Sequence, residues 1–171
     1  FSRIIQGCMN WGKWGSSLSQ NEMEKLIHFN LEKGITSFDH ADIYGDYTTE
    51  IEFGKAFKNS SIKREEVQLI SKCGIQYVGE TRLNKVKHYQ YDSDYIIFSA
   101  EKSIKDLNAD YLDDVLVKVT NTKSQVNKKR LARWTNSDGN RSSAGNLQNP
   151  CFVYYNLDGM LLPALPLAVA F

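Results

Sequence analysis

The stretch Gly34-Ile35-Thr36-Ser37-Phe38-Asp39-His40-Ala41-Asp42-Ile43-Tyr44-Gly45 decides how this 171-residue chain is interpreted. Gly34 is placed to end a helix, and the mostly apolar residues 35–38 predict a short buried strand. Asp39 stands at the end of that strand, and Tyr44 follows five residues later in the loop just past it. The stretch therefore predicts an acid and a phenol at the same edge of a sheet.

Strand-like and helix-like segments alternate through the first two thirds of the chain. Ser19 and Glu22 form a capping-box pattern that predicts the start of a first helix, and Thr49 with Glu52 indicates a second box. A polar, tyrosine-rich loop is expected over residues 76–94, before a third helix. The strands are expected to start near residues 4, 35, 67 and 114. Short strands without a G-x-G-x-x-G turn favour a (β/α) barrel over a doubly wound sheet.

The composition indicates one globular domain and excludes some classes of partner. A net charge of +1 argues against a chain-wide role on nucleic acid or on a membrane surface. Three widely spaced cysteines without a C-x-x-C pair suit a reducing cytosol, so a cytoplasmic location is expected. We expect a trimmed N-terminus and no targeting segment, and the longest apolar run, residues 159–171, is too short to span a bilayer.

The predicted sheet edge gathers groups that could transfer a proton. The active site of a (β/α) barrel lies at the carboxyl ends of its strands, which here brings together Asp39, Tyr44, Lys72 and the loop after Gly7. Asp39 can hold Lys72 charged, and a nearby ammonium is expected to lower the pKa of Tyr44. Tyr44 could then give a proton to a carbonyl oxygen while a nicotinamide cofactor supplies hydride to the carbon.

Two motifs in this region resemble a known family. Asp39-x-Ala41-Asp42-x-Tyr44-Gly45 resembles the D-x-A-x-x-Y-G signature of the aldo-keto reductases, and Lys72 in Leu69-Ile70-Ser71-Lys72 resembles that family's catalytic lysine. The resemblance covers roughly residues 2–118. It implies an α/β fold, namely the N-terminal half of a (β/α)8 TIM barrel. It also implies an NADPH-dependent oxidoreductase of aldehydes or ketones, in which Tyr44 is the general acid and Asp39 and Lys72 tune it.

The same resemblance implies a set of cofactor-binding residues. The segment after the first strand is similar to the one that lies beside the nicotinamide in the family. Val119-Thr120-Asn121 looks like the family's segment that holds the carboxamide. The cofactor-binding residues implied are Gly7, Met9, Trp11, Asp39, Thr120 and Asn121. For Trp11 and Trp14, contact with substrate and capping of the barrel mouth are both open, and the resemblance favours contact for Trp11.

The chain departs from the family pattern after the fourth strand. Lys118 follows this strand, where the family has a histidine. Residues 127–171 contain no counterpart of the basic, glycine-rich segment that grips the 2′-phosphate of NADPH. We therefore expect two parts, the half barrel at 1–118 and an irregular, disordered or frame-shifted tail at 119–171. The alternative function is that of a truncated, non-catalytic relative acting at most as an interaction module.

His40 is the one residue here that raises the question of a metal. It stands between Asp39 and Asp42, but no second histidine occurs at ligand spacing. We interpret it as a polar loop residue and expect no metal. The expected partner is a small carbonyl substrate, with no role on nucleic acid or membrane.

Overall fold

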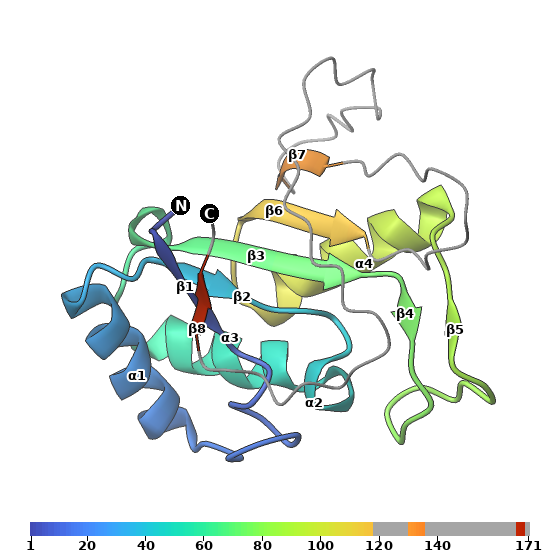
Figure 1. Cartoon of the computed structure of the whole chain (residues 1–171), viewed down its shortest axis with the longest axis horizontal. Helices are drawn as coiled ribbons and strands as arrows, with labels where there is room; N and C mark the ends of the chain where they lie inside the picture. The colour runs from blue at the N-terminus through green and yellow to red at the C-terminus, as the bar shows by residue number, and fades with distance from the viewer. Residues whose placement is uncertain (118–129, 136–166, 170–171) are drawn as a thin grey trace.

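The computed structural model of the chain describes residues 1–117, 130–135 and 167–169, with side chains over 1–117. Four parallel strands form the centre of its main sheet (Figure 1). They lie side by side in chain order, as β1 (Ile4–Gly7), β2 (Ser37–Asp39), β3 (Gln68–Cys73) and β6 (Tyr111–Val117). Helical segments connect them, so the predicted parallel β/α arrangement is confirmed.

The first helix begins as the sequence predicts. In α1 (Gln20–Glu32) the Ser19 amide donates to Glu22 Oε2 at 2.8 Å, and the Glu22 amide donates to Ser19 Oγ at 3.4 Å. Gly34 follows with φ +74°, a conformation that glycine adopts without strain. The predicted capping box is therefore present.

The second predicted capping box, Thr49 with Glu52, is wrong. Helix α3 (Thr49–Asn59) has Thr48 as its N-cap residue, and Thr48 makes no capping bond with its side chain. Thr49 already lies inside the helix, and its buried hydroxyl has no hydrogen-bond partner within residues 1–117. The Glu52 amide bonds to the Thr48 carbonyl at 3.1 Å instead.

The expected loop at 76–94 contains regular structure. β4 (Ile75–Gln76) pairs antiparallel with β5 (His88–Tyr89), and Figure 1 shows this hairpin extending away from the main sheet. Helix α4 (Ser93–Asp106) begins before the loop was expected to end, because Asp92 caps it by accepting the Tyr95 amide at 3.0 Å.

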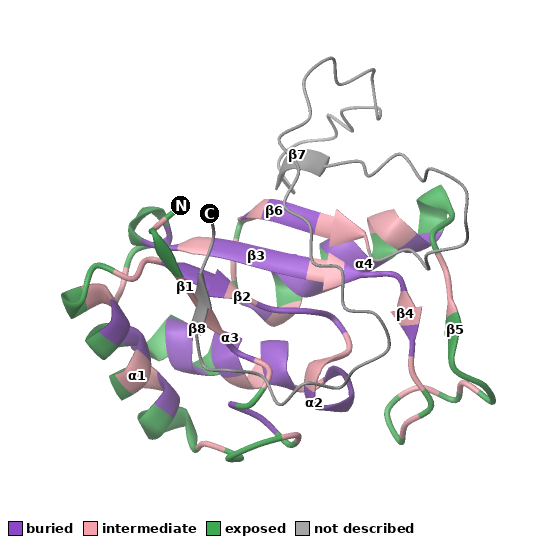
Figure 2. Cartoon of the chain, viewed as in Figure 1, coloured by how far each residue is buried: buried purple, intermediate pink, exposed green. Residues whose placement is uncertain are grey.

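The core lies between the parallel sheet and its helices. α4 packs on β3 and β6, and α1 packs on α3. Figure 2 shows β3 buried over most of its length, as expected for a strand with neighbours on both sides. The fully buried apolar side chains of the core include Met23, Ile27, Phe38, Phe53, Leu69, Ile104, Leu107 and Leu112.

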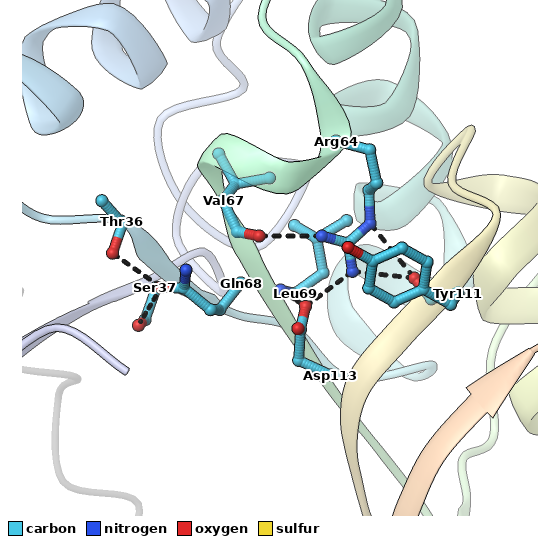
Figure 3. Close-up of polar contacts among 8 residues, drawn as sticks. All are labelled: Thr36, Ser37, Arg64, Val67, Gln68, Leu69, Tyr111 and Asp113. Carbon is cyan, nitrogen blue, oxygen red and sulfur yellow. Dashed lines mark hydrogen bonds and ion pairs between the residues drawn. The ribbon is translucent and has the colours of Figure 1, made fainter.

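A largely buried ion pair joins the N-terminal ends of β3 and β6, at the edge opposite the predicted site (Figure 3). It joins Arg64, in the short 3-10 turn η1 (Arg64–Glu66), to Asp113 at 2.6 Å. Arg64 also donates to the carbonyls of Val67 and Tyr111, and Asp113 accepts the Leu69 amide. Figure 3 also shows hydrogen bonds that join β2 to β3 there, among Thr36, Ser37 and Gln68.

Two short antiparallel strands flank the four parallel ones. β7 (Arg130–Thr135) pairs with β6, and β8 (Leu167–Val169) pairs with β1. The rest of the predicted tail at 119–171 lies outside the described residues. None of the helices in the described ranges is long and apolar enough to cross a membrane.

Candidate active site

Lys72 is the centre of a polar cluster at the C-terminal edge of the sheet. Its ammonium donates to Asp39 Oδ1 at 2.5 Å and to the His40 carbonyl at 2.7 Å. The backbone holds the same residues together, since the His40 amide donates to the Ile70 carbonyl and the Asp42 amide donates to the Lys72 carbonyl. Neighbouring parallel strands therefore present the acid and the ammonium to each other directly.

Tyr44 completes this cluster from the start of α2 (Tyr44–Tyr47), a short helical turn after β2. The Lys72 ammonium lies 5.2 Å from the centre of the Tyr44 ring. The Tyr44 amide donates to the Ala41 carbonyl at 3.1 Å, which makes a tight turn between Asp39 and Tyr44. Asp39, Tyr44 and Lys72, the three side chains predicted to carry chemistry, thus meet in one place.

The protonation states in the cluster differ from the sequence-based expectation. Burial raises the pKa of Tyr44, and the Asp39 carboxylate adds to this rise, while Lys72 only partly offsets it. Burial acts to lower the pKa of Lys72, but Asp39 and Tyr44 outweigh it and raise that pKa above its usual range. The expected lowering of the Tyr44 pKa is therefore wrong in sign. At neutral pH the site holds a neutral phenol next to an ammonium.

Two buried carboxyl groups lie behind the strand that carries Lys72. Glu50, from α3, accepts the hydroxyls of Ser71 and Ser103 at 2.6 and 2.9 Å. Burial raises its pKa to about 7. Asp42 accepts the hydroxyls of Tyr95 and Ser99, and burial raises its pKa as well. These contacts fasten α3 and α4 to the strand end that positions Lys72, and they were not predicted.

The residues expected to bind the cofactor are only partly described. Gly7 pairs with Asp39 across β1 and β2, and a Cβ built on Gly7 would meet no atom of the described residues within 4 Å. Among the described residues, the space next to Gly7 is therefore open. Met9 follows β1 and is half-buried. Thr120 and Asn121 lie outside the described residues.

The resemblance favoured contact with substrate for Trp11 and left Trp14 open, but it is Trp14 that lies beside Tyr44. Trp11 is only 7% exposed and packs against Phe38 and Phe53 in the core. Trp14 instead lies beside Tyr44, with ring centres 6.5 Å apart, and beside Tyr77 at 5.2 Å. Tyr77, from the tyrosine-rich segment after β4, was not singled out from the sequence.

His40 is not the polar loop residue that was predicted. Its ring is fully buried and meets the Phe53 ring edge-on, with centres 4.4 Å apart. Within residues 1–117 neither ring nitrogen has a hydrogen-bond partner, and burial lowers its pKa to about 3. In the described part of the chain, no three side chains of metal-ligating type come together.

Asp46 is a further buried carboxylate at this edge of the sheet, two residues after Tyr44. It is 2% exposed and accepts the backbone amides of Glu80 and Thr81 at 2.8 and 3.3 Å. Lys13 lies 3.6 Å from the same oxygen. Burial opposes ionisation of Asp46, but these amides and Lys13 hold its pKa below the usual range.

Comparison with known sequences identifies longer relatives. A sequence model of the aldo/keto reductase family matches residues 3–126. Oxidoreductases of Bacillus subtilis (the uncharacterized YcsN) and of Escherichia coli (YdhF) are 40% and 39% identical over 118 and 117 residues, or 68% of this chain. A 6-dehydroglucose reductase of Agrobacterium fabrum is 34% identical over 117 residues. These matches span only 38–39% of each relative's length.

Solved structures show the same fold over the same part of the chain. A glycerol dehydrogenase from Gluconobacter oxydans superposes with a TM-score of 0.58 at 24% identity, over 71% of this chain and 37% of that one. An aldo-keto reductase from Bacillus halodurans, in its holo form, gives 0.54 at 25% identity, over 67% and 35%. The predicted N-terminal part of a TIM barrel is thereby confirmed.

Proposed function

Since the chain belongs to the aldo/keto reductase family, we propose that it contributes the proton-donating half of an NADPH-dependent oxidoreductase that reduces an aldehyde or a ketone. The observation that carries the proposal is the meeting of Asp39, Lys72 and Tyr44 at one edge of the sheet. A carboxylate, an ammonium and a phenol in contact form a unit that can deliver a proton to a substrate oxygen.

Tyr44 is the general acid in this proposal. Burial raises the pKa of the phenol, so it keeps its proton at neutral pH and has it available for the carbonyl oxygen. Lys72 lies next to the phenol and stabilises the tyrosinate that remains after proton transfer. Asp39 holds the ammonium in place and keeps it charged. We expect the reduction rate to fall only as pH rises above the ordinary phenol pKa of about 10.

The cofactor would lie beside this cluster, against Gly7 and Met9. NADPH supplies the hydride in this chemistry. The open space over Gly7 and the position of Asp39 on the neighbouring strand support a nicotinamide ring at this place. Thr120 and Asn121 stay in the proposal as residues that hold the carboxamide.

The test combines cofactor binding with removal of the phenol. NADPH fluorescence is titrated with the chain, and turnover of 4-nitrobenzaldehyde is then followed in the wild type and in Tyr44→Phe. We expect binding in both proteins and a loss of turnover of about 100-fold or more in the variant, since general acid catalysis contributes about that much. Tyr91→Phe, which removes the hydroxyl of an exposed tyrosine, is the matched control.

A second candidate is a non-catalytic relative that acts as an interaction module. It is favoured by Lys118, which follows β6 where the family pattern has a histidine. The same titration separates the two candidates. Failure to bind NADPH, or turnover in Tyr44→Phe equal to that of the wild type, would reject the reductase function. Tight binding with phenol-dependent turnover would reject the second candidate.

A further inference from the structure

Three loops of the candidate site meet at the carboxylate of Asp46. Lys13 belongs to the loop after β1 and stands next to Trp14, and Asp46 itself belongs to the turn α2 that follows β2. Glu80 and Thr81 come from the segment after β4, which also carries Tyr77. Trp14 and Tyr77, which we call the aromatic pair, pack against each other beside Tyr44. A single buried side chain therefore connects all three loops that bring aromatic rings to the site.

The turn that carries Asp46 is held in a strained conformation. Gly45, Asp46 and Tyr47 have φ of +60°, +60° and +67°, a region that residues other than glycine rarely occupy. Such strain persists only where the surroundings impose it, and it is concentrated at functional sites. Tyr47 helps to impose it, because its hydroxyl accepts the Tyr77 amide at 2.9 Å.

Gly79 shows how closely the two loops fit. A Cβ built on Gly79 would lie 1.9 Å from Asp46 Oδ1, which no real contact permits. The backbone at Gly79 thus lies so close to the carboxylate that a residue with a Cβ does not fit without a shift. The exposed pair of Lys13 with Glu80, at 2.8 Å, adds a surface contact to the same junction, and exposed pairs contribute little. The amide bonds to the buried carboxylate are the stronger part of the junction.

We propose that Asp46 is a positioning residue, which fastens segment 77–81 to the turn after Tyr44 and so fixes the aromatic pair as the surface that selects the carbonyl substrate. The selection of substrate by the aromatic pair rests on the proposed function. The fastening of segment 77–81 by Asp46 does not. A rigid pair of flat rings beside Tyr44 favours an aryl carbonyl over a short aliphatic one, because offset and edge-to-face ring contacts add to the apolar area buried.

Amide hydrogen exchange tests the fastening without any need for activity. Asp46→Gly removes the carboxylate and relieves the left-handed strain at once, so it keeps the chain foldable. We expect exchange at the Glu80 and Thr81 amides to rise about tenfold or more, since hydrogen bonds to charged groups contribute about 1.5–3 kcal/mol. Gly79→Ala should have the same effect from the other side of the contact. Asp46→Asn should keep most of the protection, because its amide oxygen accepts the same bonds and asparagine tolerates positive φ.

Control variants show whether a change in hydrogen exchange at Glu80 and Thr81 comes from loss of the Asp46 carboxylate. Asp110→Gly places the same substitution at an exposed aspartate and should leave the Glu80 and Thr81 amides unchanged. If these amides stay protected in Asp46→Gly, the fastening is refuted. Equal loss of protection in Asp46→Asn and Asp46→Gly would also overturn it, because the acceptor oxygen would then be irrelevant.

Substrate preference tests the second step. In a chain that reduces carbonyls, Asp46→Gly should lower kcat/KM for 4-nitrobenzaldehyde relative to propanal by about tenfold, mainly through KM, with NADPH binding unchanged. An unchanged ratio would refute the selective role of the aromatic pair. A chain that reduces neither aldehyde would refute the proposed function instead, and hydrogen exchange would still decide whether Asp46 fastens the loops.

Discussion

Tyr44 lies close to two charges of opposite sign, and a single substitution removes either of them. Lys72 acts to lower the pKa of the phenol, while Asp39 and, above all, burial act to raise it. Because Asp39 and Lys72 are also paired with each other at 2.5 Å, each limits the effect of the other on the phenol. The electrostatics of the site therefore depend on the pair as a unit.

Single substitutions at these two residues should move the pKa of Tyr44 in opposite directions. Lys72→Met should raise it, because only burial and the carboxylate then act. Asp39→Asn should lower it, because the ammonium then acts without its counter-charge. The measurement is a pH titration of Tyr Cζ chemical shifts by NMR, with the Tyr44 signal assigned by its loss in Tyr44→Phe. Asp110→Asn is the control, and shifts of the same sign in both variants would contradict this account.

At the scale of elements, the N-terminal edge of the sheet depends on the pair of Arg64 and Asp113. Both side chains are largely buried, and the guanidinium also stacks on the Tyr111 ring at 3.8 Å. In parallel β/α folds this edge contributes stability, while the opposite edge carries function. The pair fixes the start of β3 against the start of β6, and the register of β3 determines where Lys72 lies.

Arg64→Met should therefore cost about 3–5 kcal/mol of the free energy of unfolding, because it leaves the Asp113 carboxylate buried without its partner. The measurement is urea denaturation. Arg3→Met, at an exposed arginine, should stay within about 0.5 kcal/mol of the wild type. A loss of less than about 1 kcal/mol in Arg64→Met would show that solvent reaches Asp113 and that the pair does not hold the edge.

The sequence predicts those elements that depend on residues close together in the chain. The parallel strands, helix α1 with its Ser19 box, and the meeting of Asp39 with Lys72 follow from periodicity, from one capping motif and from the rule that strand ends share an edge. The contacts of Asp46 could not be predicted, because it bonds to amides 34 and 35 residues away. The burial of His40 could have been predicted, because side chains alternate along a strand and Asp39, its neighbour, faces the site.

At the scale of the whole molecule, two buried groups make stability depend on pH in opposite ways. His40 is neutral when folded, with a pKa of about 3 instead of 6.5 through burial and the nearby Lys72. Its contribution to stability is lost as pH falls from about 6.5 toward 3. Glu50 has a folded pKa of about 7 instead of 4.5 through burial, with Asp42 and Asp106 adding to the rise. Its contribution is present at low pH and is lost as pH rises from about 4.5 to 7.

Between about pH 4.5 and 6.5 the pH dependence of stability due to His40 should cancel that due to Glu50. Without Glu50, the pH dependence due to His40 should be seen. The folded state binds the Glu50 proton more tightly than the unfolded state does, so the wild type loses stability as the pH rises. Glu50→Gln stays neutral at every pH and does not have this loss. We expect the free energy of unfolding of Glu50→Gln, relative to the wild type, to rise by about 2 kcal/mol between pH 5 and pH 7. Urea denaturation at both values measures it, with exposed Glu32→Gln as the control. The same difference from the wild type at both values would mean that Glu50 is ionised in the folded chain and that the serines alone stabilise its charge.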